Sequence, residues 1–136
     1  MRNTGYLLIG LLLLISCKNA TSDVDEAVVE QTEEQARQLR HVVLFSFKET
    51  ASPAEVEKIE AAFANLAVEI DEIKAFEWGL NNSPENLNKG FTHCFFVTFT
   101  SEQDRDQYLV HPKHKEFGAL LGPFLEDVLV VDYWKQ

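Results

Sequence analysis

The sequence predicts an α+β domain of ferredoxin-like type, with the element order βαββαβ and one antiparallel four-stranded sheet. Three observations lead to this expectation. Four segments are rich in β-branched and aromatic residues, as strands are. Two stretches between them carry apolar residues at helical spacing. The order in which these stretches alternate places both helices on one face of the sheet.

The expected strands are short apolar segments separated by helices or polar loops. Asn81–Gly90, which contains Pro84, is the polar loop between the second and third strands. In this order of elements the first and third strands are central neighbours, and we expect them to run parallel. The four strands are His41–Lys48, Ile73–Leu80, Phe91–Thr100 and Val128–Trp134.

The first helix has a clear N-terminus. Ser52 can cap it, Pro53 suits its first turn, and Glu55 completes a capping box. One apolar face follows at three- and four-residue spacing, which indicates a helix packed against the sheet. That face consists of Val56, Ile59, Phe63, Leu66 and Ile70.

The second helical stretch is interrupted. Ser101 can cap a helix that runs to about Val110, and His111-Pro112 then breaks it. A further helical piece continues to Gly122-Pro123, which ends it.

The strands are apolar at odd and even positions alike, as in Val42, Val43, Leu44 and Phe45. The helices can cover one face only, and the other would expose an apolar sheet to water, which soluble proteins avoid. A two-fold homodimer, in which two sheets pack face to face as an α/β barrel, removes this exposure. We expect His41, Val43 and Phe45 to face the helices, and Val42 and Leu44 to face the partner.

The first sixteen residues (1–16) predict a bacterial lipoprotein signal peptide. Arg2 supplies a positive charge, and Tyr6–Ile15 is a nearly continuous apolar run that is too short to span a bilayer. The run ends in the lipobox pattern Leu14-Ile15-Ser16-Cys17, so Cys17 is the expected lipidation site. An ordinary signal peptide, or a buried helix with a chance cysteine, is the alternative.

Residues 17–40 are expected to form the lipidated cysteine and an acidic, disordered tether, because few large apolar side chains are present. Lys18 after the cysteine favours sorting to the outer membrane. The expected location is therefore the cell envelope, with the protein anchored to the membrane by the lipid on Cys17, on its periplasmic or surface face. Residues 41–136 then form a single domain.

The chain is acidic, with 12 Lys and Arg against 22 Asp and Glu and a formal net charge of −10. Such a surface repels phosphate backbones, which argues against a nucleic-acid partner. Once Cys17 carries lipid, Cys94 has no partner for an intrachain disulfide, and we interpret it as a small buried hydrophobe.

All four histidines and one tyrosine are expected at one end of the sheet. If the first and third strands run parallel, His41 and His93 lie side by side near their starts. The second helical stretch then returns Tyr108, His111 and His114 to the same end. Two interpretations stay open: a functional pocket between the sheet and the helices, or a structural hydrogen-bond cluster.

Five segments of the predicted domain carry a resemblance to a known family. They are HVVLFSF at 41–47, EWG at 77–79, KGFTHCFFVTF at 89–99, YLVHPKH at 108–114 and VLVVDY at 128–133. Through them the chain resembles the stress-responsive dimeric α/β-barrel family, the Dabb domain. The third-strand histidine together with Tyr-x-x-His-Pro-x-His is the most specific feature. The resemblance implies a ferredoxin-like protomer, a homodimeric barrel and a link to stress responses.

The resemblance also implies roles for individual residues. In plant polyketide cyclases similar to this family, the tyrosine and the last histidine of that motif are the catalytic pair, which corresponds here to Tyr108 and His114. Where those cyclases place a pocket tyrosine on the first helix, this chain has Phe63, which lacks that polar contact to a phenolic substrate. The expected ligand-binding residues are His41, Phe63, His93 and His111.

A tyrosine and a histidine together are competent for acid–base chemistry, because histidine titrates near neutrality and tyrosine can donate to a developing oxyanion. The first functional hypothesis is a dimer that binds a small apolar or phenolic molecule in each protomer. The second is a cofactor-free lyase, cyclase or isomerase that uses Tyr108 and His114. A stabilising scaffold without a ligand is the third.

Other chemistries are less well supported by the residues. The four histidines, with His111-x-x-His114 among them, could supply nitrogen ligands for zinc. Proline interrupts that spacing and no carboxylate lies within it, so no metal is expected. The serines and Cys94 lack the sequence context of a nucleophile, no glycine-rich phosphate loop is present, and no cofactor is expected.

Overall fold

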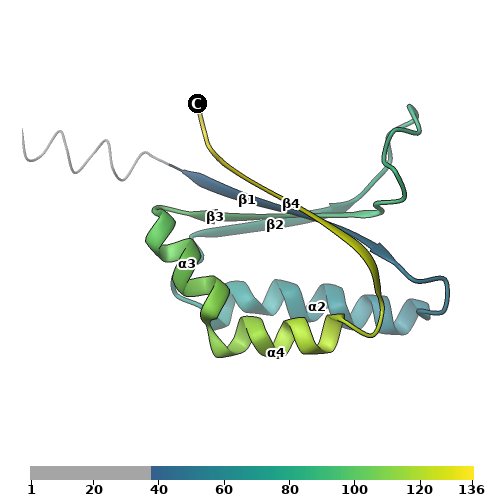
Figure 1. Cartoon of the computed structure of the whole chain (residues 1–136), viewed down its shortest axis with the longest axis horizontal. Helices are drawn as coiled ribbons and strands as arrows, with labels where there is room; N and C mark the ends of the chain where they lie inside the picture. Colours follow the sequence, from purple (N-terminus) through teal and green to yellow (C-terminus); the bar gives the residue numbers. More distant parts are fainter. Residues whose placement is uncertain (1–37) are drawn as a thin grey trace, which may run out of the picture.

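The computed structural model describes residues 38–136, and Figure 1 shows them as one sheet with helices against one of its faces. The predicted signal peptide, Cys17 and nearly all of the predicted tether lie outside the described residues. The elements follow the expected order, with the second helical stretch divided in two. They are β1 (Leu39–Phe47), α2 (Pro53–Glu69), β2 (Ala75–Leu80), β3 (His93–Phe99), α3 (Glu102–Val110), α4 (Pro112–Leu121) and β4 (Leu125–Trp134).

The domain begins earlier than the sequence suggests. β1 starts at Leu39, two residues before the predicted boundary at residue 41. The Leu39 side chain is only 2% exposed and belongs to the hydrophobic core. Residues 39 and 40 are therefore part of the folded domain and not of the tether.

The four strands form one antiparallel sheet in the order β2-β3-β1-β4, and the domain has the ferredoxin-like fold. The expectation that the first and third strands run parallel is wrong, because β1 and β3 pair antiparallel with Val43 opposite Phe95. The crossover through α2 makes β1 and β2 parallel, as strand–helix–strand connections do. β3 lies between these two strands and is antiparallel to both, so β1 and β3 begin at opposite ends of the sheet.

β1 is covered on one face and partly open on the other. Its residues alternate between buried and half-buried from Leu39 to Phe45. His41, Val43 and Phe45 are buried against the helices, and Val42 and Leu44 lie on the opposite face. The predicted orientation of this strand is confirmed.

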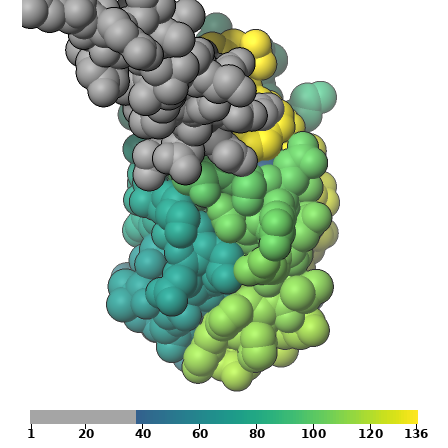
Figure 2. Space-filling model, turned by 90° about the vertical axis from the view of Figure 1, so that its left-hand side faces the viewer, coloured from purple at the N-terminus to yellow at the C-terminus, as the bar shows by residue number. Residues whose placement is uncertain are grey.

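α2 begins as its capping residues predict. The Ser52 side chain accepts a hydrogen bond from the Glu55 backbone N–H, and the Glu55 carboxylate accepts one from the Ser52 N–H at 2.8 Å. The helix buries Ile59, Phe63 and Leu66 against the sheet. Figure 2 shows α2, in teal, beside α3 and α4, in green, as one continuous layer.

His111 and Pro112 divide the second helical stretch into α3 and α4. Proline disfavours helical geometry in the residue before it, and His111 is extended, with φ −60° and ψ 137°. His111 Nδ1 then accepts a hydrogen bond from the Lys113 backbone N–H at 3.2 Å and so caps α4. One residue thus ends α3 and starts α4, which turns the chain between them.

The outer face of the sheet leaves apolar side chains in contact with solvent. Leu129, Val131 and Tyr133 of β4 are 44%, 46% and 43% exposed. Phe96 of β3 lies on the same face, where its ring meets that of Tyr133 edge-on at 6.4 Å. Within residues 38–136, no helix combines the length and the apolar character needed to cross a membrane.

Candidate functional site

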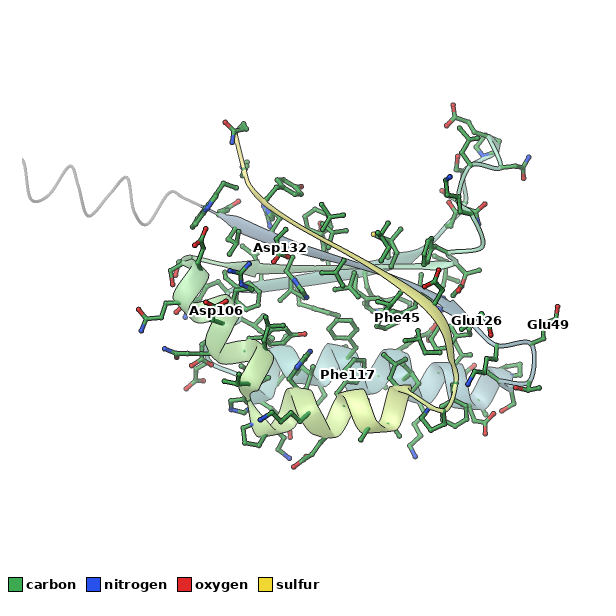
Figure 3. The ribbon with its side chains drawn as sticks, viewed as in Figure 1. Phe45, Glu49, Asp106, Phe117, Glu126 and Asp132 are labelled. Carbon is green, nitrogen blue, oxygen red and sulfur yellow. The ribbon has the colours of Figure 1, made fainter. Side chains whose placement is uncertain are left out.

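A cavity of about 410 Å³ lies between the inner face of the sheet and helices α3 and α4. Its walls are mostly apolar, and Figure 3 shows Phe45 of β1 and Phe117 of α4 pointing toward each other across this space. A mostly apolar pocket with a few convergent polar groups is typical of small-molecule sites. The polar side chains that line it are His41, Tyr108, His114 and Asp132.

The cavity opens along the edge of the sheet. Val128 and Val130 of β4 line it, although 43% and 49% of these side chains are exposed. β4 is an edge strand, so no further strand covers this side. A small molecule can therefore reach the interior between β4 and α4.

His41 forms the sheet wall of the polar end. Its side chain is 5% exposed, and its Nδ1 lies 2.7 Å from Asp132 Oδ1. An ionised carboxylate only accepts hydrogen bonds, so His41 carries its proton on Nδ1. The ring also meets the Tyr108 ring edge-on, with centroids 5.7 Å apart.

Tyr108 of α3 is 1% exposed, and its ring lies 4.4 Å from that of His114. No hydrogen bond joins its hydroxyl to another described residue, which leaves that hydroxyl able to donate to a ligand. Burial raises the pKa of Tyr108 well above its usual range, because the charged phenolate is poorly solvated there. Tyr108 is therefore a neutral hydrogen-bond donor.

The His114 ring is fixed by a carbonyl group that the end of α3 leaves unpaired. α3 ends at Val110, and the carbonyls of a last helical turn have no partner within the helix. The N–H of Lys113, which would reach Leu109 if the helix continued, donates instead to His111 Nδ1. The Leu109 carbonyl accepts a hydrogen bond from His114 Nδ1 at 3.2 Å. This bond places the His114 proton on Nδ1 and leaves Nε2 as an acceptor.

His114 is held in its neutral form. Burial has the largest effect and lowers the pKa of His114, and nearby His41 and His111 lower it further. The hydrogen bond to the Leu109 carbonyl opposes this shift without cancelling it. A neutral imidazole with a free Nε2 can accept a proton from a bound molecule.

Asp132 is a polar residue of this site that the sequence analysis did not single out. It lies directly opposite His41 in the β1–β4 pairing, and its Oδ2 accepts a hydrogen bond from Arg105 Nη1 at 2.6 Å. Partial burial alone would raise the pKa of Asp132, but hydrogen bonds from Arg105 and His41 outweigh it and hold that pKa below its usual range. The period of β4 is the signal that could have found it, because Asp132 shares a face with Val128 and Val130.

His93, expected beside His41, lies at the other end of the sheet. In the antiparallel register His93 pairs with Phe45, whereas His41 pairs with Val97. The His93 Nε2 lies 3.0 Å from a Glu60 carboxylate oxygen of α2, and His93 does not line the cavity. The expected place of His93 beside His41 is wrong, since it followed from parallel strands. His93 instead lies among the residues that line a second cavity, with Trp78 and Phe91.

The remaining predicted residues are divided between the cavity and its surroundings. Phe63 lines the cavity together with His41, Tyr108 and His114. His111 does not line it and instead caps α4. Among residues 38–136, no group of three or more His, Cys, Asp and Glu side chains is arranged to hold a metal ion.

Comparisons with curated relatives agree with this fold. The chain is 43% identical over 101 residues to the stress-response A/B barrel domain-containing protein HS1 of Arabidopsis thaliana, which covers 74% of this chain and 93% of the relative. It is 32% identical over 95 residues to olivetolic acid cyclase of Cannabis sativa, which covers 70% of this chain and 94% of the relative.

Solved structures give the same result. Hydroxynitrile lyase from Passiflora edulis matches with a TM-score of 0.69 and 30% identity, over 73% of this chain and 94% of the lyase. A dimeric ferredoxin-like protein from Thermobifida fusca matches with a TM-score of 0.63 and 26% identity, over 71% of this chain and 90% of that one. The family model of the stress responsive A/B barrel domain matches residues 39–135. The chain therefore belongs to the stress-responsive A/B barrel (Dabb) domain family.

Proposed function

We propose that the protein is a cofactor-free acid–base enzyme of lyase or cyclase type that acts on a small, neutral carbonyl or phenolic compound. The observation that carries this proposal is the pairing of Tyr108 with His114 at the wall of the apolar cavity, with ring centroids 4.4 Å apart. One residue is a neutral donor, and the other is a neutral acceptor with its tautomer fixed by Leu109.

In the proposed reaction, His114 Nε2 removes a proton from a carbon or hydroxyl group of the substrate. The Tyr108 hydroxyl donates a hydrogen bond to the carbonyl oxygen on which negative charge develops. The electron pair left on the substrate forms a bond in a cyclisation or breaks one in a lyase reaction. His114 then returns its proton to the product or to the leaving group, so no oxidant or reductant is needed.

The charges of the cavity favour a neutral substrate. Among the residues that line it, Asp132 is the one Asp, Glu, Lys or Arg side chain. Its charge is shared between Arg105 and His41, and no lysine or arginine faces the interior. An anionic head group would lose its hydration and gain no cation in return.

The enzyme names of two relatives, olivetolic acid cyclase and hydroxynitrile lyase, support a catalytic role. Ligand binding without turnover is the second candidate, and the apolar walls around Phe45, Phe63 and Phe117 support it. A binding protein of this kind would suit the stress-related description of the family.

Conversion of an unknown substrate can be tested without choosing the compound in advance. The full chain, purified in detergent, is incubated with the small-molecule fraction of the cells that make it, beside a His114→Ala variant. We expect untargeted mass spectrometry to find a neutral carbonyl or phenolic compound that the wild type consumes and the variant does not. A compound that both proteins retain and neither converts would contradict catalysis and establish binding instead.

We also propose that two copies pair through the outer faces of their sheets. The exposed apolar side chains of β4 and the dimeric state of a related ferredoxin-like protein support this assembly. Val42→Asp places a charge on that face and is expected to convert a micromolar dimer to a monomer in sedimentation velocity. Val68→Asp on α2, where Val68 is 81% exposed, is the matched control and should stay dimeric. A dimeric Val42→Asp protein would contradict this interface.

We further propose that lipid on Cys17 anchors the protein to the cell envelope, at the outer membrane. The apolar run and the lipobox at residues 6–17 support this proposal. Cys17→Ala is expected to abolish incorporation of radiolabelled palmitate and to release the protein from the membrane fraction. Equal labelling of both proteins would contradict lipidation.

A further inference from the structure

Arg105 contacts the candidate site only through another residue. It does not line the cavity, but its Nη1 donates to Asp132 Oδ2 at 2.6 Å. The other oxygen of the same carboxylate, Oδ1, lies 2.7 Å from His41 Nδ1. The two oxygens of Asp132 are thus divided between a cation outside the cavity and a histidine inside it.

We propose that Arg105 is a positioning residue, which holds the Asp132 carboxylate and thereby keeps the His41 imidazole protonated on Nδ1, with Nε2 presented to the cavity as an acceptor. This inference deepens the proposed acid–base function and rests on it. It adds a second histidine of fixed tautomer, whose ring also contacts that of Tyr108. A substrate hydroxyl could then donate to His41 Nε2 while its carbonyl oxygen accepts from Tyr108.

Helix α3 contacts His41 in two ways. Tyr108 packs directly on its ring, and Arg105 reaches it through Asp132. Arg105 and Tyr108 are three residues apart in α3, so they lie on the same side of the helix. One helix therefore sets both the ring position and the hydrogen bond of His41.

The Asp132 carboxylate needs such a partner because of its place in the sheet. β4 is an edge strand, and 28% of the Asp132 side chain is exposed, so water competes for its oxygens. Without Arg105, the carboxylate would be free to turn to solvent, and His41 Nδ1 would lose the acceptor that fixes its tautomer. The ring proton could then move to Nε2, which would no longer be held as an acceptor.

The second partner of Arg105 provides a matched control. Arg105 Nε donates to Asp106 Oδ1 at 2.8 Å, but 66% of the Asp106 side chain is exposed. Exposed ion pairs contribute little, since water screens them. Figure 3 places Asp106 on α3 and Asp132 beneath β4, on the side of the helices. Loss of Asp106 should therefore leave the Asp132–His41 hydrogen bond intact.

The test reads the tautomer of His41 directly. The full chain is labelled with ¹⁵N-histidine and studied by NMR in detergent near neutral pH, with the His41 signals assigned from a His41→Gln sample. We expect an unprotonated Nε2 signal in the wild type and in Asp106→Asn. That signal should be lost in Arg105→Gln and largely restored in Arg105→Lys, which keeps the cation.

Two outcomes would overturn the inference: a folded Arg105→Gln protein that keeps the wild-type His41 signals, or an equal loss in Asp106→Asn. If Arg105→Gln does not fold, the wild type decides. In a wild-type sample labelled with ¹⁵N-arginine, the Arg105 guanidinium should then give separately resolved Nη signals, and a freely rotating group would overturn the inference. The NMR measurement needs no substrate. A negative result for the role of Arg105 is therefore distinct from a negative result for catalysis, which the metabolite experiment tests.

Discussion

Replacement of His114 by alanine is expected to lower kcat/KM by about 10²–10⁴-fold, because it removes the proton acceptor of the proposed reaction. The substrate for this measurement is the compound that the extract experiment identifies. His114→Gln is the sharper variant, since its amide N–H can still donate to the Leu109 carbonyl while no basic nitrogen remains. Near-wild-type activity in a folded His114→Gln protein would show that another group takes the proton.

The pH dependence follows from the same residue. His114 acts in its neutral form, and its pKa lies below the ordinary value of 6.5. Activity is therefore expected at neutral pH and should be lost only as the pH falls through that lowered value. Tyr108 should cause no loss of activity near neutral pH, because burial raises its pKa and keeps the hydroxyl protonated.

Tyr108→Phe separates the two functional candidates. The change keeps the ring that packs on His41 and His114 and removes only the hydroxyl. In an enzyme, kcat should fall sharply, because the hydroxyl stabilises charge that develops only in the transition state. In a binding protein, affinity should change by about 0.5–1.5 kcal/mol, as expected for one hydrogen bond.

Phe95→Ala is expected to lower the free energy of unfolding by about 3–5 kcal/mol, a large part of the roughly 5–15 kcal/mol that stabilises a domain. Phe95 of β3 is fully buried, and its ring centroid lies 4.5 Å from that of Phe63 and 5.1 Å from that of Phe45. The substitution removes this contact and leaves a cavity at the centre of the aromatic cluster.

Urea unfolding of the full chain measures this loss. Leu87→Ala is the control, because Leu87 lies in the loop between β2 and β3 and is 74% exposed. Its effect should stay within about 0.5 kcal/mol, as for surface substitutions. A loss below about 1 kcal/mol in Phe95→Ala would mean that the core can close around the missing ring.

Local patterns predicted the secondary structure well. The capping residues Ser52 and Glu55 fix the start of α2, and Pro112 fixes the break between α3 and α4. The period of two along a strand placed His41 on one face with Val43 and Phe45, as observed. These features depend on neighbouring residues in the chain, so one sequence is enough to predict them.

The residues of a strand do not determine whether it runs parallel or antiparallel to its neighbours. His93 was misplaced because the pattern of β3 is the same whichever way the strand runs beside β1. The connections decide that direction, because the helical crossover makes β1 and β2 parallel and β3 then turns back beside β2. Applying this rule first would have separated His93 from His41.

The charged part of the site depends on contacts between distant segments. Asp132 faces His41 across two strands, and Arg105 reaches Asp132 from a helix. In the sequence, Asp132 is a single polar residue within VLVVDYW. Arg105 is a single charged residue in a helix that the sequence suggests is exposed. The pairing of β1 with β4 brings Asp132 to His41, and the packing of α3 brings Arg105 to Asp132.

The pairing of Leu39 with Trp134 also bears on the order in which the domain folds. β1 is made first but lies at the centre of the sheet, between β3 and the last strand. Each of its ladders closes a long loop, and such non-local contacts slow folding. β4 follows every other described element along the chain. Until β4 has been synthesised, β1 can therefore be paired on one edge only.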